Sequence, residues 1–112
     1  MNEAEVKRIA TETFLELTKG NLKYFENTAY KKGQEALTRY FNQEASPEER
    51  EAIKEIERDR YYPIIGFCFD CGWTTEQIAE RLSCDTSTVS RNKKRLVIAY
   101  YNAIAERKDF EW

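Results

Sequence analysis

Apolar residues recur at helical spacing through the first half of the chain. Residues 6–17 carry one apolar stripe, which stops before Gly20, and residues 22–41 carry a second, longer one. Apolar positions three and four residues apart predict amphipathic helices, and glycine commonly follows a helix end. Gly33 lies inside the second stripe, where glycine costs about 1 kcal/mol relative to alanine, so we expect another helix to approach closely there.

The middle of the chain predicts a third helix with a clear start. The sequence SPEE at 46–49 combines an N-cap serine, a proline at the first helical position and a glutamate at the third. Apolar spacing continues through Ile53 and Ile56, and we expect Pro63 to kink or break the helix, because proline lacks a backbone N–H. The apolar face then resumes at Ile64, Phe67, Cys68 and Cys71.

Residues 73–96, WTTEQIAERLSCDTSTVSRNKKRL, predict a short helix, a tight corner and a second helix. Thr74 and Gln77 have the spacing of a capping box, in which each side chain satisfies a backbone N–H of the other residue. Residues 83–85 form the corner, the last of them an aspartate suited to cap the second helix, and Val89 is expected in the core. This order of elements is the helix-turn-helix arrangement, whose second helix enters the DNA major groove.

The chemistry of the second helix agrees with DNA binding. Short hydroxyl residues come first, and four cations then fall in the five positions from 91 to 95. A helix in the major groove needs donors for base edges near its start and cations for phosphates along its flanks. Arg91 can donate two hydrogen bonds to a guanine. The alternative interpretation is that the cations from 91 to 95 form a solvated face of the helix that binds no ligand. The candidate DNA-binding residues are Thr74, Gln77, Thr86, Ser87, Thr88, Ser90, Arg91, Lys93, Lys94 and Arg95.

Three segments between residues 61 and 101, YYPIIGFCFDCG, WTTEQIAERL and STVSRNKKRLVIAY, resemble the ArpU and RinA class of phage late-gene transcription regulators. Proteins of this class carry a C-terminal helix-turn-helix similar to the DNA-binding end of sigma factors. The resemblance implies control of phage or prophage late genes in a bacterial host cell. The chain departs from the pattern of this class at one place. The apolar seam of the second helix passes from Val89 to Leu96 and is interrupted by the polar residues Asn92 and Lys93, so we expect looser packing there.

The composition argues against several classes of protein. Of the 112 residues, 41% are hydrophobic and 13% aromatic, which is not the composition of a disordered chain. No apolar run approaches the length of about 18 residues that a membrane span requires, so we expect no membrane partner. The chain has no histidine and no glycine-rich phosphate loop, which removes the commonest general base and a common nucleotide motif. We therefore expect neither an enzyme nor a cofactor.

Charge and cysteine content add two constraints. The formal net charge of −2 is unusual for a DNA-binding domain, and we interpret it as an acidic body behind a basic edge, which would weaken non-specific binding. Cys68 and Cys71 form a C-x-x-C motif, but a zinc site usually needs four ligands, and the chain has three cysteines and no histidine. We therefore expect no metal, and cysteines packed as small apolar residues in a reducing cytoplasm.

The pattern as a whole predicts an all-α fold with N-terminal helices packed on a C-terminal helix-turn-helix module. Residues 1–45 would form a helical pair for oligomerisation or for a partner such as RNA polymerase, and residues 46–112 would form the DNA-binding module with an extended C-terminal helix. From 96 to 104 that helix carries more apolar residues than a surface helix accommodates, so either the N-terminal helices or a second subunit must cover them. A homodimer would read half-sites about ten base pairs apart.

We therefore expect a sequence-specific double-stranded DNA-binding protein that regulates transcription. Two alternatives stay open at this point. One is a DNA-packaging protein like the small subunit of a phage terminase, which also joins a helix-turn-helix to helical oligomerisation segments. The other is a helix-turn-helix-derived protein-interaction module that does not bind DNA, which the sequence pI of about 5.3 and the polar residues Asn92 and Lys93 would fit.

Overall fold

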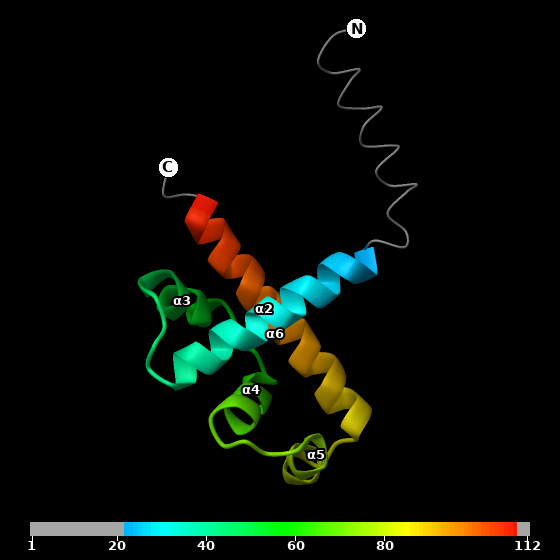
Figure 1. Cartoon of the computed structure of the whole chain (residues 1–112). Helices are drawn as coiled ribbons and strands as arrows, with labels where there is room; N and C mark the ends of the chain where they lie inside the picture. Colours follow the sequence, from blue (N-terminus) through cyan, green and yellow to red (C-terminus); the bar gives the residue numbers. More distant parts are fainter. Residues whose placement is uncertain (1–21, 110–112) are drawn as a thin grey trace, which may run out of the picture.

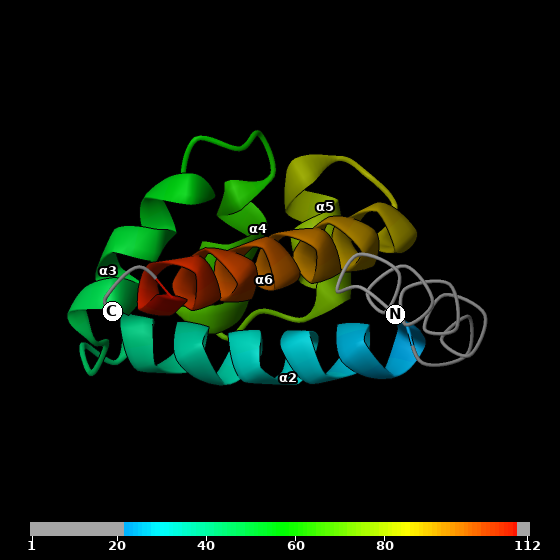
Figure 2. The same ribbon diagram turned by 90° about the horizontal axis from the view of Figure 1, so that it is seen from above.

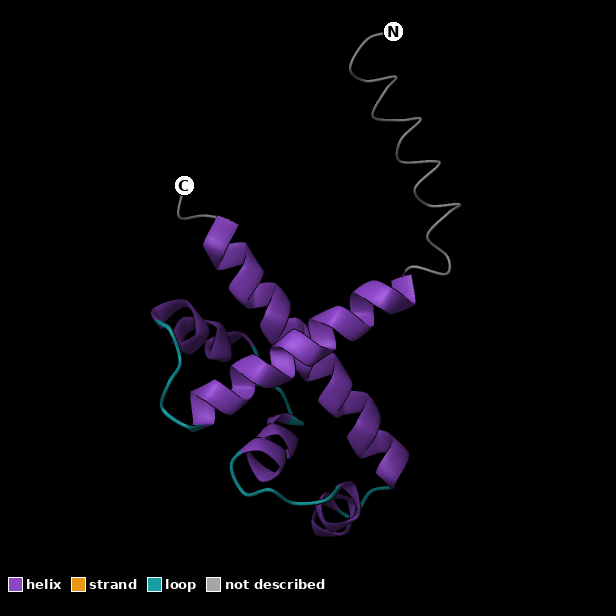
Figure 3. Ribbon diagram, viewed as in Figure 1, coloured by secondary structure: helices purple, strands orange, loops and turns teal. Residues whose placement is uncertain are grey.

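The computed structural model describes residues 22–109, and this part of the chain is all-α (Figure 3). Its helices are α2 (Leu22–Phe41), α3 (Pro47–Ala52), the short 3₁₀ helix η1 (Ile53–Glu55), α4 (Tyr62–Phe69), α5 (Thr75–Leu82) and α6 (Thr86–Asp109). The predicted fold class and the helix expected over residues 22–41 are confirmed. The apolar stripe at 6–17 lies outside the described residues.

Helix α6 is the central element of the molecule. Helix α2 crosses it on one face, and α3, α4 and α5 cover the opposite face (Figure 1, Figure 2). Between these layers α6 buries Leu96, Val97, Tyr100, Ala103 and Ile104. Most of the apolar surface for which we expected a cover is therefore buried within one chain, with Ile98, Ala99 and Tyr101 partly exposed, and it no longer argues for a second subunit.

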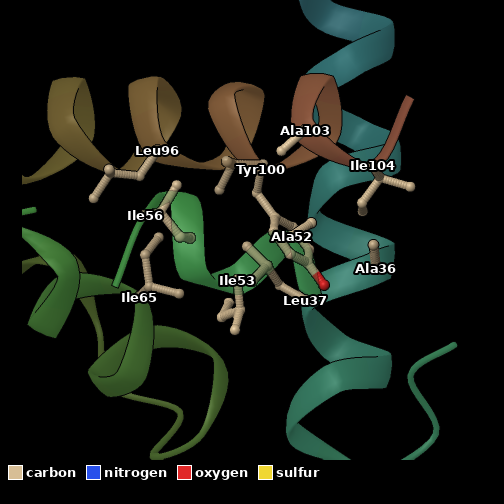
Figure 4. Close-up of a cluster of buried hydrophobic side chains, with 11 residues drawn as sticks. Ala36, Leu37, Ala52, Ile53, Ile56, Ile65, Leu96, Tyr100, Ala103 and Ile104 are labelled. Carbon is tan, nitrogen blue, oxygen red and sulfur yellow. The ribbon is translucent and has the colours of Figure 1, made fainter. Parts of the chain in front are cut away.

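The main core lies where α2, α3, η1, α4 and α6 meet (Figure 4). Ala36 and Leu37 of α2 belong to the same cluster as Ile53, Ile65 and Tyr100, which come from three other elements. Helices on both sides of the α2–α3 connection thus share one core. The assignment of residues 1–45 to partner contact and residues 46–112 to DNA binding stays a prediction.

The crossing of α2 and α6 depends on Gly33. A Cβ atom at this position would lie 2.6 Å from Val97 Cγ1 and 2.6 Å from Val97 O, so the two helices approach more closely than any larger side chain would permit. The predicted close contact at Gly33 is confirmed, and it sets the position of α2 over the middle of α6.

Polar groups tie α3 to both long helices. Arg39 of α2 forms an ion pair of 2.9 Å with the buried carboxylate of Glu49. Ser46 Oγ accepts a hydrogen bond from Glu49 N at 3.2 Å, which confirms the predicted N-cap of α3. Tyr100 Oη of α6 donates to Glu49 O at 2.9 Å, and burial raises the pKa of Tyr100 well above its usual value.

Two expectations about local structure are wrong. The helix that Ser46 opens ends at Ala52 and gives way to η1, so the break falls before Pro63. Pro63 lies instead in the first turn of α4, where the missing N–H removes no helical hydrogen bond. Cys71 is exposed and does not extend the apolar face of α4, because that helix ends at Phe69 and the chain turns away.

Candidate nucleic-acid interface

Helices α5 and α6 and the three residues between them form the predicted helix-turn-helix arrangement at one end of the molecule (Figure 1). The capping box of α5 is complete. Thr74 Oγ1 accepts from Gln77 N at 3.2 Å, and Gln77 Oε1 accepts from Thr74 N at 2.8 Å. Both capping roles are confirmed, and both side chains remain exposed at the surface.

A left-handed residue and an aspartate close the corner between α5 and α6. Ser83 ends α5 with φ at 54°, and its N–H group bonds to carbonyl oxygens of the last helical turn. Asp85 Oδ1 accepts from Thr88 N at 2.8 Å and from Ser87 Oγ at 3.0 Å, which confirms Asp85 as the N-cap of α6. These hydrogen bonds, above all those from Thr88, hold the pKa of Asp85 below its usual range.

A second apolar cluster anchors this corner to α4. Its buried centre consists of Ile64, Ile78, Ala79 and Val89. Phe67 of α4 stacks on Trp73, which precedes α5, with the ring centroids 4.4 Å apart. Val89 is 1% exposed, as predicted, and this contact fixes which side of the first turns of α6 faces the core.

The opposite side of these turns faces solvent. Thr86, Ser87, Ser90 and Arg91 are exposed, and Thr88 is partly buried. Arg91 forms no ion pair and no side-chain hydrogen bond within the residues that the structure describes. The structure therefore brings the residues predicted to read bases together on one accessible surface.

Lys93 is directed toward the body of the molecule. Its ammonium group lies 5.8 Å from the ring centroid of Tyr30 in α2 and 5.5 Å from that of Phe69 in α4. Lys93 and Asn92 are both partly buried at the position where we expected looser packing of the apolar seam. Burial opposes the positive charge, but interactions with Cys68 and Tyr30 outweigh it and raise the pKa of Lys93. The phosphate contact predicted for Lys93 would need this side chain to leave its site.

Arg95 and Lys94 are each paired with a carboxylate. Arg95 Nη1 and Nη2 donate to the two oxygens of Asp59 at 2.9 Å, and Nε also donates to Asn92 Oδ1 at 3.2 Å. The hydrogen bonds from Arg95 are the main reason why the pKa of Asp59 falls to about 2. Lys94 Nζ lies 3.7 Å from Glu26 Oε2 of α2, in a longer and more exposed pair.

Sequence reasoning missed two features of this surface. The carboxylates Glu26 and Asp59 meet α6 only through the tertiary fold, so no local pattern could point to them. Arg81 is an exposed cation one helical turn after Gln77, and helical spacing from Gln77 could have identified it. Arg81 and Gln77 line a hollow of about 380 Å³ on α5, together with Trp73 and Glu80.

The remaining chemistry of the described residues is limited. No three histidine, cysteine, aspartate or glutamate side chains gather there as a metal site, and Cys68, Cys71 and Cys84 carry free thiols. None of the helices in this part of the chain is long and apolar enough to cross a bilayer. The exposed hydroxyl groups and cations of α5 and α6 are suited to base edges and phosphates.

Comparisons of the chain with protein-family models, with curated proteins and with solved structures found no match. The resemblance of residues 61–101 to the ArpU and RinA class therefore stays a prediction from short motifs. Function has to be argued from the geometry of α5, α6 and the carboxylates around them.

Proposed function

We propose that this chain is a sequence-specific double-stranded DNA-binding protein that regulates transcription, with the first turns of α6 in the major groove. One observation carries the proposal. Ser87, Ser90 and Arg91 share the exposed side of these turns, and Arg91 has no ion-pair partner within the described residues. Short neighbours allow the helix to approach the groove floor, and an available guanidinium can then donate to a base edge. The motif resemblance supports phage or prophage late genes as targets.

Neighbouring residues supply contacts to the phosphate backbone. Lys94 flanks the base-reading turn in a long, exposed pair, and Thr74, Gln77 and Arg81 are exposed on α5. Cations and polar side chains beside a groove-bound helix commonly bind phosphates and fix its register. Lys93 and Arg95 are held by the body of the molecule, so this proposal assigns them no DNA contact.

Selection from a pool of random duplexes tests the proposal, because it returns the preferred site whatever the operator sequence is. The full chain is incubated with the pool at low salt, and bound duplexes are amplified over several rounds. We expect a motif that contains at least one guanine, because arginine in the major groove most often pairs with guanine. A pool that stays random although it binds the chain contradicts sequence-specific recognition.

Substitutions on α6 should separate base reading from phosphate binding. Arg91→Ala should reduce the preference for the selected duplex by roughly 1–3 kcal/mol, because a bidentate base contact is lost. Lys94→Ala should weaken all duplexes alike and make the dependence of log K on log salt shallower by about one. Fluorescence anisotropy over a salt series measures both effects. Unchanged affinity and preference in Arg91→Ala would show that the assigned role is wrong.

One observation favours a second candidate, a protein-interaction module that does not bind DNA. Lys93, Lys94 and Arg95 already contact groups of the same chain, and the net charge is −2. Such a surface could serve a protein partner without any need for phosphates. Binding to a mixed-sequence duplex at low salt separates the two functions, because a DNA-binding protein retains measurable non-specific affinity there.

A further inference from the structure

Two adjacent cations of α6 are paired with carboxylates from the two layers that flank this helix. Asp59 lies between η1 and α4 and pairs with Arg95, whereas Glu26 lies on α2 and pairs with Lys94. The two pairs have the same formal charges but different geometry. This difference indicates different roles at the proposed DNA surface.

The pair of Arg95 with Asp59 is built as a fixed connection. Both Asp59 oxygens accept from the guanidinium at 2.9 Å, and Asp59 Oδ1 also accepts from Tyr61 N at 2.9 Å. Asn92 Oδ1 accepts from Arg95 as well, and Asn92 Nδ2 donates to Thr88 O at 2.9 Å. Bidentate, charge-assisted hydrogen bonds of this kind restrict geometry as well as adding energy. The network joins the η1–α4 connection to the turn of α6 that carries Arg91.

The pair of Lys94 with Glu26 has the opposite character. Its N–O distance is 3.7 Å, and the two side chains are 43% and 56% exposed. Pairs of this kind contribute little to stability, because solvent screens the charges and both side chains lose freedom. A DNA phosphate beside α6 can therefore replace Glu26 as the partner of Lys94 at little cost.

We propose that Glu26 competes with DNA phosphates for Lys94 and so limits binding of this surface to arbitrary duplex, while Asp59 holds Arg95 as a positioning residue for the base-reading turn. The inference rests on the proposed function, because it names what limits the overall affinity of that same site for duplex DNA and what positions its base-reading turn. It also gives one acidic group of the molecule a role, since a carboxylate that competes with phosphates for a lysine lowers non-specific affinity.

Glu26→Gln and Asp59→Asn form a matched pair of tests, because each removes one negative charge beside α6. The full chain and both variants are titrated with a mixed-sequence duplex and with the selected duplex over a salt series. Glu26→Gln should bind the mixed duplex roughly two- to fivefold more tightly at low salt, with a salt dependence steeper by up to about one. Asp59→Asn should leave the salt dependence unchanged and lower the ratio of selected to mixed affinity.

Two controls isolate the proposed effects. Glu35→Gln removes an exposed charge from the same helix α2 without touching Lys94, so it should change mixed-duplex affinity less than Glu26→Gln does. The effect of Glu26→Gln should also shrink in a Lys94→Gln background. Thermal unfolding of each variant checks that it folds. If Asp59→Asn is unstable, Glu26→Gln still tests the inference, because Glu26 is exposed and its substitution should not unfold the chain.

The outcomes distinguish this inference from the proposed function. Equal effects of Glu26→Gln and Asp59→Asn, or of Glu26→Gln and Glu35→Gln, would overturn the inference while leaving DNA binding intact. A parent chain that binds no duplex even at low salt would overturn the proposed function, and the role of Glu26 with it.

Discussion

Arg91 and Arg95 carry the same guanidinium group one helical turn apart on α6, but their surroundings differ. Asp59 and Asn92 surround the Arg95 group with three acceptor oxygens, whereas no acceptor within the described residues holds Arg91. A side chain whose donors are already satisfied gains little from a new acceptor, because it must first give up the old one. Position on the helix and available donors therefore both favour Arg91 as the base-reading residue.

The pair of Asp59 and Arg95 predicts a specific dependence of stability on pH. The pKa of Asp59 lies at about 2 in the folded chain, below its ordinary value of 3.8, so ionised Asp59 stabilises the fold above that value. This contribution is lost as the pH falls from the ordinary to the folded pKa. Because Asp59 and Arg95 are 25% and 49% exposed, the contribution should be on the order of 1 kcal/mol.

The variant Asp59→Asn isolates this effect, because asparagine does not titrate. Denaturant unfolding of the parent chain and the variant should give a constant difference in the free energy of unfolding near neutral pH. The difference should close as the pH falls from 3.8 to about 2. A difference that persists in full at the acid end would show that Asp59 stabilises the fold by some means other than its charge.

The parts of the candidate site that depend on residues close in sequence were predictable. Thr74, Gln77 and Asp85 act within three residues of their own positions, so side-chain type and spacing suffice to predict their capping bonds. The surroundings of Lys93 and Arg95 depend on residues from other helices, and the run of cations looks the same whether or not such partners exist. Local spacing therefore identified the candidate base-reading surface but not the different surroundings of its cations.

At the scale of helices, the crossing of α2 and α6 makes a prediction about two glycines. Gly33→Ala should lower the free energy of unfolding by about 1–3 kcal/mol, because its Cβ would lie 2.6 Å from the backbone oxygen of Val97 and overpack the crossing. Gly66→Ala in α4 is the matched control, since no atom beyond its chain neighbours and its own helix backbone lies within 4 Å of the added Cβ. It should stabilise the chain by about 0.5–1 kcal/mol through helix propensity. A Gly33→Ala variant that gains stability like the control would contradict the close approach.

Helix boundaries show the same limit of local reasoning. The stripe at 22–41 and the cap at Ser46 gave α2 and the start of α3, because period and capping depend on neighbours in sequence. The early end of α3 at Ala52 was not predictable from Pro63, since the chain turns before the proline to bury Ile53 and Ile56 against α2 and α6. Tertiary packing overrode an apolar pattern that would have suited a longer helix.

At the scale of the whole molecule, α6 serves two purposes along its length. Residues 96–104 form the centre of the core between α2 and the other helices, and the first turns of α6 extend to the surface beside α5 (Figure 2). The proposed contact surface is therefore a direct extension of the core helix, and Val89 anchors it in the second apolar cluster. This arrangement suits recognition that depends on the placement of one guanidinium.

The charge distribution predicts a weak salt dependence for DNA binding. Lys93 and Arg95 are held by groups of the same chain, Lys94 has only a long, exposed pair with Glu26, and the net charge is −2, so few phosphates can be neutralised. We expect the slope of log K against log salt to lie between about −1 and −3, because each neutralised phosphate contributes about −0.9. Titrations of the selected duplex at several salt concentrations measure it. A slope of about −4 or steeper would show that the held cations Lys93 and Arg95 are released to the DNA, because each would add about −0.9.

Amide chemical shifts measure most directly whether the first turns of α6 contact DNA. An isotope-labelled chain is titrated with the duplex that selection returns. We predict that the largest shift changes fall on residues 85–91 and 74–77, while residues near the ion pair of Arg39 and Glu49 change little. Changes concentrated around Arg39 and Glu49, with residues 85–91 unaffected, would contradict it.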